Sequence, residues 1–187
     1  MQRDELIARL DVSMEFQMVA YLTGLIENSK PDVNDLLDLT FHQKKEVCFR
    51  AAWMLEHIMV NHPLDFYDHV IRFLELLPQQ ENPSAMRHYA KIVALMTAKK
   101  SSLLYKEVLT RVDHMPIIEL LFTWLIDPDV LVATKVHCMQ SLANLAPVHT
   151  WIKDELLQTI DYIQDLESVA FFARAKMVKR ELLKIDT

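Results

Sequence analysis

Glycine is almost absent from this chain of 187 residues, in which Gly24 is the only one. Tight β-hairpins normally use glycine at positive φ, so its scarcity argues against a sheet protein. It also excludes glycine-rich phosphate-binding loops, because both common fingerprints need at least two glycines. The sequence therefore favours a helical protein that binds no nucleotide through such a loop.

Cysteine is scarce as well, with Cys48 and Cys138 in two different predicted helices. Their simplest interpretation is a pair of buried free thiols. The first residues contain no apolar run of the signal-peptide kind, and no window approaches the ~20 apolar residues of a membrane span. We therefore expect a cytoplasmic protein in a reducing compartment.

The balance of the remaining residues is ordinary for a globular protein, with 51% apolar and 25% charged residues. The length is enough for one domain with a continuous core, so we expect a single domain over residues 1–187. The net charge of −6 argues mildly against general nucleic-acid binding.

Seven prolines and several capping residues divide the chain into helical segments. Asn82-Pro83 is a strong signal for the start of a helix. Plausible N-caps of other helices are Asp32, Ser13 and Ser101 or Ser102. No long stretch shows the alternation of apolar and polar residues that is typical of a half-buried strand. The predicted helices cover residues 3–10, 14–28, 33–41, 44–62, 65–77, 83–100, 103–113, 117–126, 130–145, 149–164 and, from Asp165 or Ser168, to about 184.

The helix predicted over residues 44–62 is the most strongly patterned segment. Val47, Ala51, Leu55 and Ile58 form one apolar stripe at helical spacing. Three further side chains widen it: Cys48, Ala52 and Met59. A stripe this wide needs more than one neighbouring helix to cover it.

A related pattern returns 84 residues later, where residues 36–63 align with residues 120–147. The apolar register is kept through the turn between two helices. The identical pairs are Leu36 and Leu120, Leu37 and Leu121, and Pro63 and Pro147.

A shorter period lies inside this one. The second helices of successive pairs begin near Val47, Met86, Leu131 and Ala170, in steps of 39, 45 and 39 residues. Two-helix units of about 40–47 residues are typical of HEAT and armadillo repeats. The chain therefore resembles the HEAT/armadillo-like α-solenoid superfamily.

This resemblance covers residues 31–186 as about four helix pairs and leaves residues 1–30 as an N-terminal helical cap. Arg50-Ala51-Ala52-Trp53, with small residues beside an arginine, is similar to short bacterial members of the group. The expected fold is an all-α superhelix, and the resemblance implies a fold without a reaction. The alternative is a ten-helix bundle without true repeats.

Motifs for catalysis or metal binding are missing from the sequence. Eight histidines are present, but no pair has the i,i+3 or i,i+4 spacing that puts two ligands on one helix face. His57 and His62, for example, are five residues apart. We therefore expect no metal, no cofactor and no enzymatic activity.

Charge is distributed unevenly between first and second helices. Counted from the sequence, residues 43–62, 84–100, 129–145 and 167–184 carry +1, +4, 0 and +3, so the rest of the chain carries −14. In solenoids of this superfamily the second helices usually line the concave face, which predicts a basic groove. The alternative is that these charges belong to ordinary solvated helix faces and helix C-termini.

The sequence therefore predicts a non-catalytic scaffold that binds a protein or acidic peptide along its concave second-helix face. Arginine, lysine and tryptophan suit such contacts, although a tryptophan is more often part of a core. The contact candidates are Arg50, Trp53, His57, Arg87, His88, Lys91, Lys135 and Arg174.

Two alternatives come from other classes. Bacterial DNA alkylation-repair glycosylases are HEAT-like, and Glu56 is the one candidate acid for such a role. The net charge counts against nucleic-acid binding. The second alternative is weak dimerisation through exposed apolar residues, such as Phe171 and Phe172. The chain would otherwise be a monomer.

Overall fold

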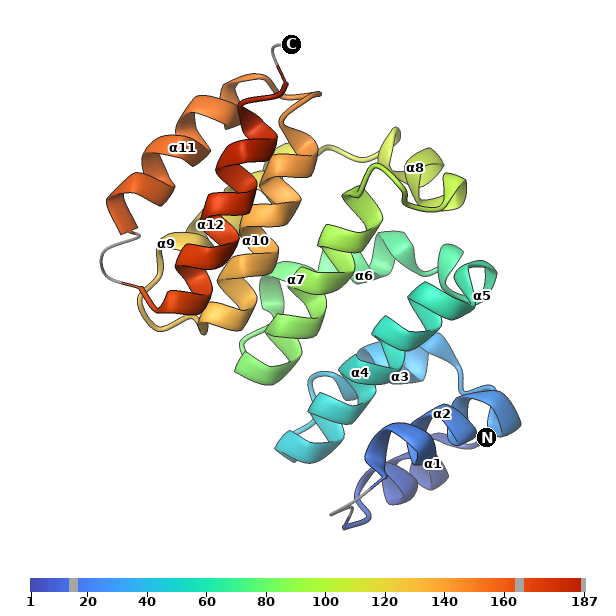
Figure 1. The fold of residues 1–187 in the computed structure, drawn as a ribbon. Coiled ribbons are helices and arrows are strands. Elements are labelled where there is room, and N and C mark those ends of the chain that lie inside the picture. The colour runs from blue at the N-terminus through green and yellow to red at the C-terminus, as the bar shows by residue number, and fades with distance from the viewer. Residues whose placement is uncertain (14–16, 164–166, 186–187) are drawn as a thin grey trace. The chain divides into compact units, whose positions relative to one another are not determined.

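All regular secondary structure is helical in this computed structural model, which describes residues 1–13, 17–163 and 167–185 (Figure 1). These residues form twelve α-helices and one short 3-10 helix, and no strand occurs among them. The predicted all-α fold class is confirmed.

The chain divides into two compact units, Met1–Tyr89 and Ala90–Thr187. The helices are α1 (Arg3–Leu10), α2 (Met18–Ser29), α3 (Val33–Leu39), α4 (Lys45–Asn61), α5 (Pro63–Tyr67), α6 (Val70–Leu76), η1 (Leu77–Gln79), α7 (Pro83–Thr97), α8 (Leu103–Leu109), α9 (Met115–Ile126), α10 (Val132–Leu145), α11 (Trp151–Ile163) and α12 (Val169–Leu182). The expectations of one domain and of a cap over residues 1–30 stay predictions.

Three of the predicted helix starts are confirmed by their capping bonds. Asp32 Oδ1 accepts from the N–H of Asn34 at 2.8 Å, and Asn82 Oδ1 accepts from the N–H of Ser84 at 3.0 Å. Ser102 Oγ accepts from the backbone N–H two residues later at 3.3 Å. Each cap satisfies a helix N–H that has no partner inside its own helix.

The prediction of one helix over residues 65–77 is wrong, because α5, α6 and η1 share that segment. The N–H of His69 bonds to the carbonyl of Phe66 at 3.0 Å, which closes a tight turn between α5 and α6. Of the helix predicted over residues 14–28, the structure describes α2, which runs from Met18 to Ser29 with Gln17 at its N-cap position. Residues 14–16 and 164–166 lie outside the described residues.

Helix α4 is the centre of the first unit and packs against α1, α2, α3 and α5. The side chains predicted for its apolar stripe are all buried, and Met54 extends the buried surface further around the helix. An interior helix of this kind is covered by several neighbours because no single one reaches its whole apolar circumference. In the second unit α10 has the same role and packs on α9, α11 and α12.

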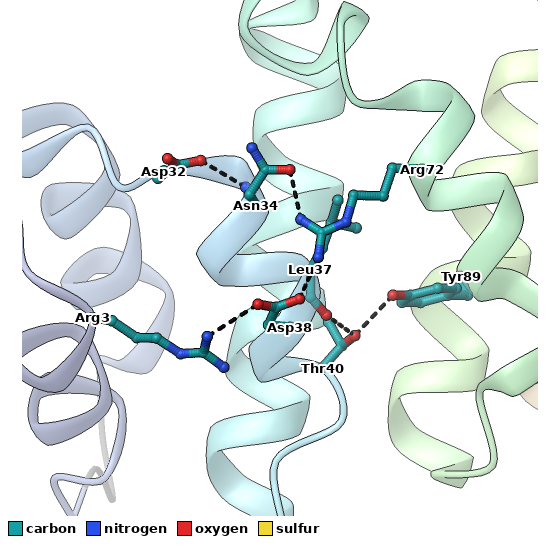
Figure 2. A network of polar contacts seen from close by, with 8 residues as sticks. All are labelled: Arg3, Asp32, Asn34, Leu37, Asp38, Thr40, Arg72 and Tyr89. Carbon is teal, nitrogen blue, oxygen red and sulfur yellow. Dashed lines mark hydrogen bonds and ion pairs between the residues drawn. The ribbon is translucent and has the colours of Figure 1, made fainter.

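Polar side chains join three helices of the first unit through the carboxylate of Asp38 in α3 (Figure 2). Arg3 of α1 reaches Asp38 Oδ2 at 3.0 Å, and Arg72 of α6 reaches Asp38 Oδ1 at 2.5 Å. Arg72 also donates to Asn34 Oδ1 at 2.6 Å. These groups are partly exposed, so each pair contributes little, but together they fix the directions of α1 and α6 on α3.

Thr40, at the end of α3, is a buried polar junction. Its hydroxyl donates to the carbonyl of Leu37 at 2.6 Å and lies 2.8 Å from the Tyr89 hydroxyl (Figure 2). Its carbonyl accepts from Cys48 Sγ at 2.7 Å and from Gln80 Nε2 at 3.1 Å. One residue therefore satisfies polar groups from α4, α7 and the segment after η1, all away from solvent.

We expect Thr40→Val to lower the free energy of unfolding by about 1–3 kcal/mol, because the Tyr89 hydroxyl loses one of its buried hydrogen-bond partners. The matched control is Thr110→Val, since the Thr110 hydroxyl makes the same local bond to Glu107 at 2.7 Å but is exposed. That change should stay within about 0.5 kcal/mol. Urea unfolding followed by circular dichroism measures both, and equal losses would contradict the role given to Thr40.

Burial raises the pKa of several protonated groups in the core. It raises the pKa of the Cys48 thiol to about 11 and that of the Tyr89 hydroxyl to about 12. The pKa values of Cys138 and Tyr105 are also raised by burial. The cause is the same at each position, because an apolar surrounding disfavours the charged form.

We therefore expect the protein to lose stability as pH rises from about 9 to 11, since thiols in the unfolded chain ionise near pH 9 while the folded chain still holds its protons. The thiol contribution to stability is complete below pH 9 and disappears as pH passes the raised values. Chemical unfolding across this range measures how steeply the free energy of unfolding falls with pH. Replacing both Cys48 and Cys138 with alanine should make this fall less steep. An unchanged pH dependence would contradict the contribution assigned to the thiols.

Candidate functional site

Arg50 does not face a partner but closes the end of α1. It is only 8% exposed, and its Nη1 donates to the carbonyls of Leu10 at 2.5 Å and Val12 at 2.8 Å. The last carbonyls of a helix have no partner inside the helix, and a cation there also suits the helix dipole. These bonds give Arg50 a structural role, and its predicted contact with a partner stays a prediction.

His88 is also structural. It is 2% exposed, its Nδ1 lies 2.7 Å from Glu56 Oε2, and its ring packs on Phe49 with centroids 5.3 Å apart. The same contact engages Glu56, the residue considered as an acid for a glycosylase. A partner could reach neither side chain without opening the contact between α4 and α7.

Lys135 is buried as well. Its side chain is 2% exposed, and its ammonium group pairs with the Glu167 carboxylate, which lies just before α12. A buried charge is tolerated when it is paired in this way, and losing the partner costs much more than the pair contributes. Lys135 therefore holds the start of α12 against α10, and its predicted contact with a partner stays a prediction.

Three candidates in the first unit remain accessible to different degrees. Trp53 and His57 are half-buried on α4 and stack with ring centroids 5.2 Å apart, and Arg87 is exposed on α7. In the second unit Lys91 is half-buried and has an interaction of its own. The prediction that these residues bind a partner stays a prediction.

Arg174 lies at a groove between two second helices of the second unit. The second helices α10 and α12 pack side by side (Figure 1). Residues of both helices line a hollow of about 460 Å³. Arg174 Nη1 donates to Gln140 Oε1 at 3.2 Å, so its guanidinium is held at the wall. The other lining residues are Val132, Ala133, Val136, Ser168, Ala170, Ala173 and Met177.

The other flank of α12 combines cations with exposed apolar side chains. Lys176 and Arg180 are exposed there, beside Phe172 at 53% and Leu183 at 65% exposure. Phe171 is fully buried, so only the second residue of the Phe171-Phe172 pair is available for the dimerisation considered above.

A cluster of possible metal ligands lies in the first unit. Ligand atoms of Glu27 from α2, His57 from α4 and His62 directly after α4 all lie within 4.8 Å of one another. Among the described residues this is the one group of three or more such side chains. The spacing of histidines along a single helix does not indicate this cluster, because only the packing of α2 on α4 brings Glu27 to the end of α4.

A family model described as the HEAT repeat domain matches residues 6–184. The chain belongs to this family. The resemblance found in residues 31–186 is thereby confirmed, and the match also includes most of the segment interpreted as a cap.

HEAT repeat domains typically serve as protein-interaction scaffolds and are generally non-catalytic. No curated protein and no solved structure matched the chain. Within the residues that the structure describes, no helix of this HEAT repeat chain is both long and apolar enough to cross a membrane.

The structural role of Arg50 gives a direct prediction. Arg50→Ala should lower the free energy of unfolding by about 1.5–3 kcal/mol, because two carbonyls lose a charged donor. The control Arg87→Ala removes an exposed arginine from another second helix and should change the free energy of unfolding by less than about 0.5 kcal/mol. Urea unfolding of both variants decides the matter, and a stable Arg50→Ala protein would show that the guanidinium is dispensable for folding.

Proposed function

We propose that this HEAT repeat chain is a non-catalytic scaffold that binds an acidic, amphipathic helical segment of a partner protein. The observation that carries the proposal is the groove between α10 and α12 in the second unit. The family supports the general role, because its members typically act as interaction scaffolds.

The shape and lining of the groove suit an apolar helix face. Its volume of about 460 Å³ lies in the range of ligand-binding clefts, and six of its eight lining residues are apolar. Small side chains such as Ala133, Ala170 and Ala173 leave room for larger side chains of a partner. An amphipathic helix binds such a groove with apolar residues spaced at i, i+3 or i+4, and i+7.

The charge at the groove favours an acidic partner. Arg174 is the one charged residue that lines the groove, whereas Lys176 and Arg180 are exposed on the other flank of the same helix and add to its positive charge. Glu181 is the one acidic residue in the sequence of α12, and it accepts a hydrogen bond from Gln140 at 3.0 Å. Complementary charge would speed association and reject basic segments more than it would add affinity.

The buried contacts also narrow the list of contact residues. Arg50, His88 and Lys135 are not used in this proposal, because each side chain is buried and has a polar atom bonded within the fold. Arg174 is retained at the groove, and Trp53, His57, Arg87 and Lys91 stay candidates elsewhere. We do not carry the glycosylase-like alternative forward, because Glu56 and two of the cations that it would use are engaged inside the protein.

The test uses peptides displayed on phage and selected on the full chain. We expect enriched peptides to carry aspartate or glutamate together with large apolar residues at helical spacing. They should bind the double variant Ala173→Glu, Met177→Glu at least about tenfold more weakly, a difference of about 1.4 kcal/mol. Both positions are exposed in the free chain, so the variant should fold.

The matched control is Phe172→Glu, Leu183→Glu, which adds the same charge on the other flank of α12. It should keep most of the affinity. Enriched peptides without an acidic or apolar bias, or equal binding to wild type and the groove variant, would contradict the proposal.

A further inference from the structure

We propose that Glu27, His57 and His62 bind a divalent transition-metal ion, with Zn²⁺ as the probe that fits them best. Two imidazoles and one carboxylate are a frequent zinc donor set, in which water takes the fourth position. The proposal is independent of the groove in the second unit, because all three residues belong to the first unit.

The side chains already lie close to the arrangement that an ion requires. His62 Nε2 is 2.9 Å from Glu27 Oε1, and the rings of His57 and His62 have centroids 6.3 Å apart. Donors bound about 2.1 Å from a tetrahedral ion are about 3.4 Å from one another. The present separations of up to 4.8 Å therefore close with small side-chain rotations.

The helix ends around the cluster favour a cation. Glu27 lies in the last turn of α2, which ends at Ser29, and His62 directly follows α4, which ends at Asn61. A helix C-terminus carries about half a negative charge. Helix α5 begins at Pro63, but it has only five residues and an aspartate in its first turn.

A hollow beside the cluster leaves room for a fourth ligand. Glu27 and His62 line a cavity of about 390 Å³. Asp32 and Asp65 also line it, and Lys30 is its one lysine, so negative groups outnumber positive ones there. A bound ion would therefore keep a position open to water or to a small anion.

Trp53 provides a local reporter for this site. Its ring stacks on His57 at 5.2 Å with an interplanar angle of 25°. The other two tryptophans, Trp124 and Trp151, belong to the second unit. A paramagnetic ion such as Cu²⁺ bound through His57 should quench the fluorescence of Trp53 directly.

The experiment is calorimetric titration of the full, metal-stripped chain with Zn²⁺, repeated for Glu27→Gln and His62→Ala. We expect one ion per chain and a loss of affinity of at least about tenfold in each variant, since even indirect support of a metal site is worth that much. The Glu27 side chain is 52% exposed, so its change should leave the fold intact, as circular dichroism would verify.

The control is His149→Ala, which removes one member of a second histidine pair. His149 Nε2 lies 2.9 Å from His114 Nδ1, a contact with two possible ligands. This variant should keep full Zn²⁺ affinity. Two outcomes would overturn the proposal. Loss of binding in His149→Ala alone would place the ion at the other histidine pair, and equal affinity in all the variants would show that the binding is adventitious.

Fluorescence gives a second readout that does not depend on the calorimetry. Cu²⁺ should quench the wild-type emission with a one-to-one end point, and Trp53→Phe should lose that quenched component while still binding the ion. Quenching that persists unchanged in Trp53→Phe would contradict a site at His57.

Discussion

The buried carbonyl and hydroxyl of Thr40 are the groups on which the packing of the first unit depends. A helix that ends inside a core leaves polar backbone groups away from water, and each unpaired group costs about 1–3 kcal/mol. At the end of α3 these groups are satisfied by Cys48 and Gln80, and the hydroxyl is satisfied by Leu37 and Tyr89. Because the partners come from three other segments, α4 and α7 cannot shift against α3 without breaking several bonds together.

The same requirement explains why two charged side chains of the second helices, Arg50 and Lys135, face inward. Arg50 closes the end of α1, and the buried cation of Lys135 is matched by Glu167. In a stack of helices each second helix meets the ends of its neighbours, where polar groups need partners. The surface left for a partner is therefore poorer in charge than the sequence count suggests, and at the groove between α10 and α12 it is mainly apolar.

Much of the fold could be predicted because its signals are local. Helix starts are predicted by the capping residues Asp32, Asn82 and Ser102, and the apolar spacing from Val47 to Ile58 predicts the buried face of α4. The site could not be predicted in the same way, because burial of Arg50 or His88 depends on residues more than 30 positions distant. Glu27 and His62 show the limit most clearly, since only the packing of α2 on α4 brings them together.

The arrangement of the helices also bears on how the chain acquires its structure. Within each unit the packing partners are mostly near neighbours in sequence: α3 packs on α4, α9 on α10, and α10 on α11 and α12. Contacts of this kind require only short loops to close, so the entropic barrier to folding stays low. A helix pair can therefore form soon after it leaves the ribosome, and the first unit can assemble while the second is still being synthesised.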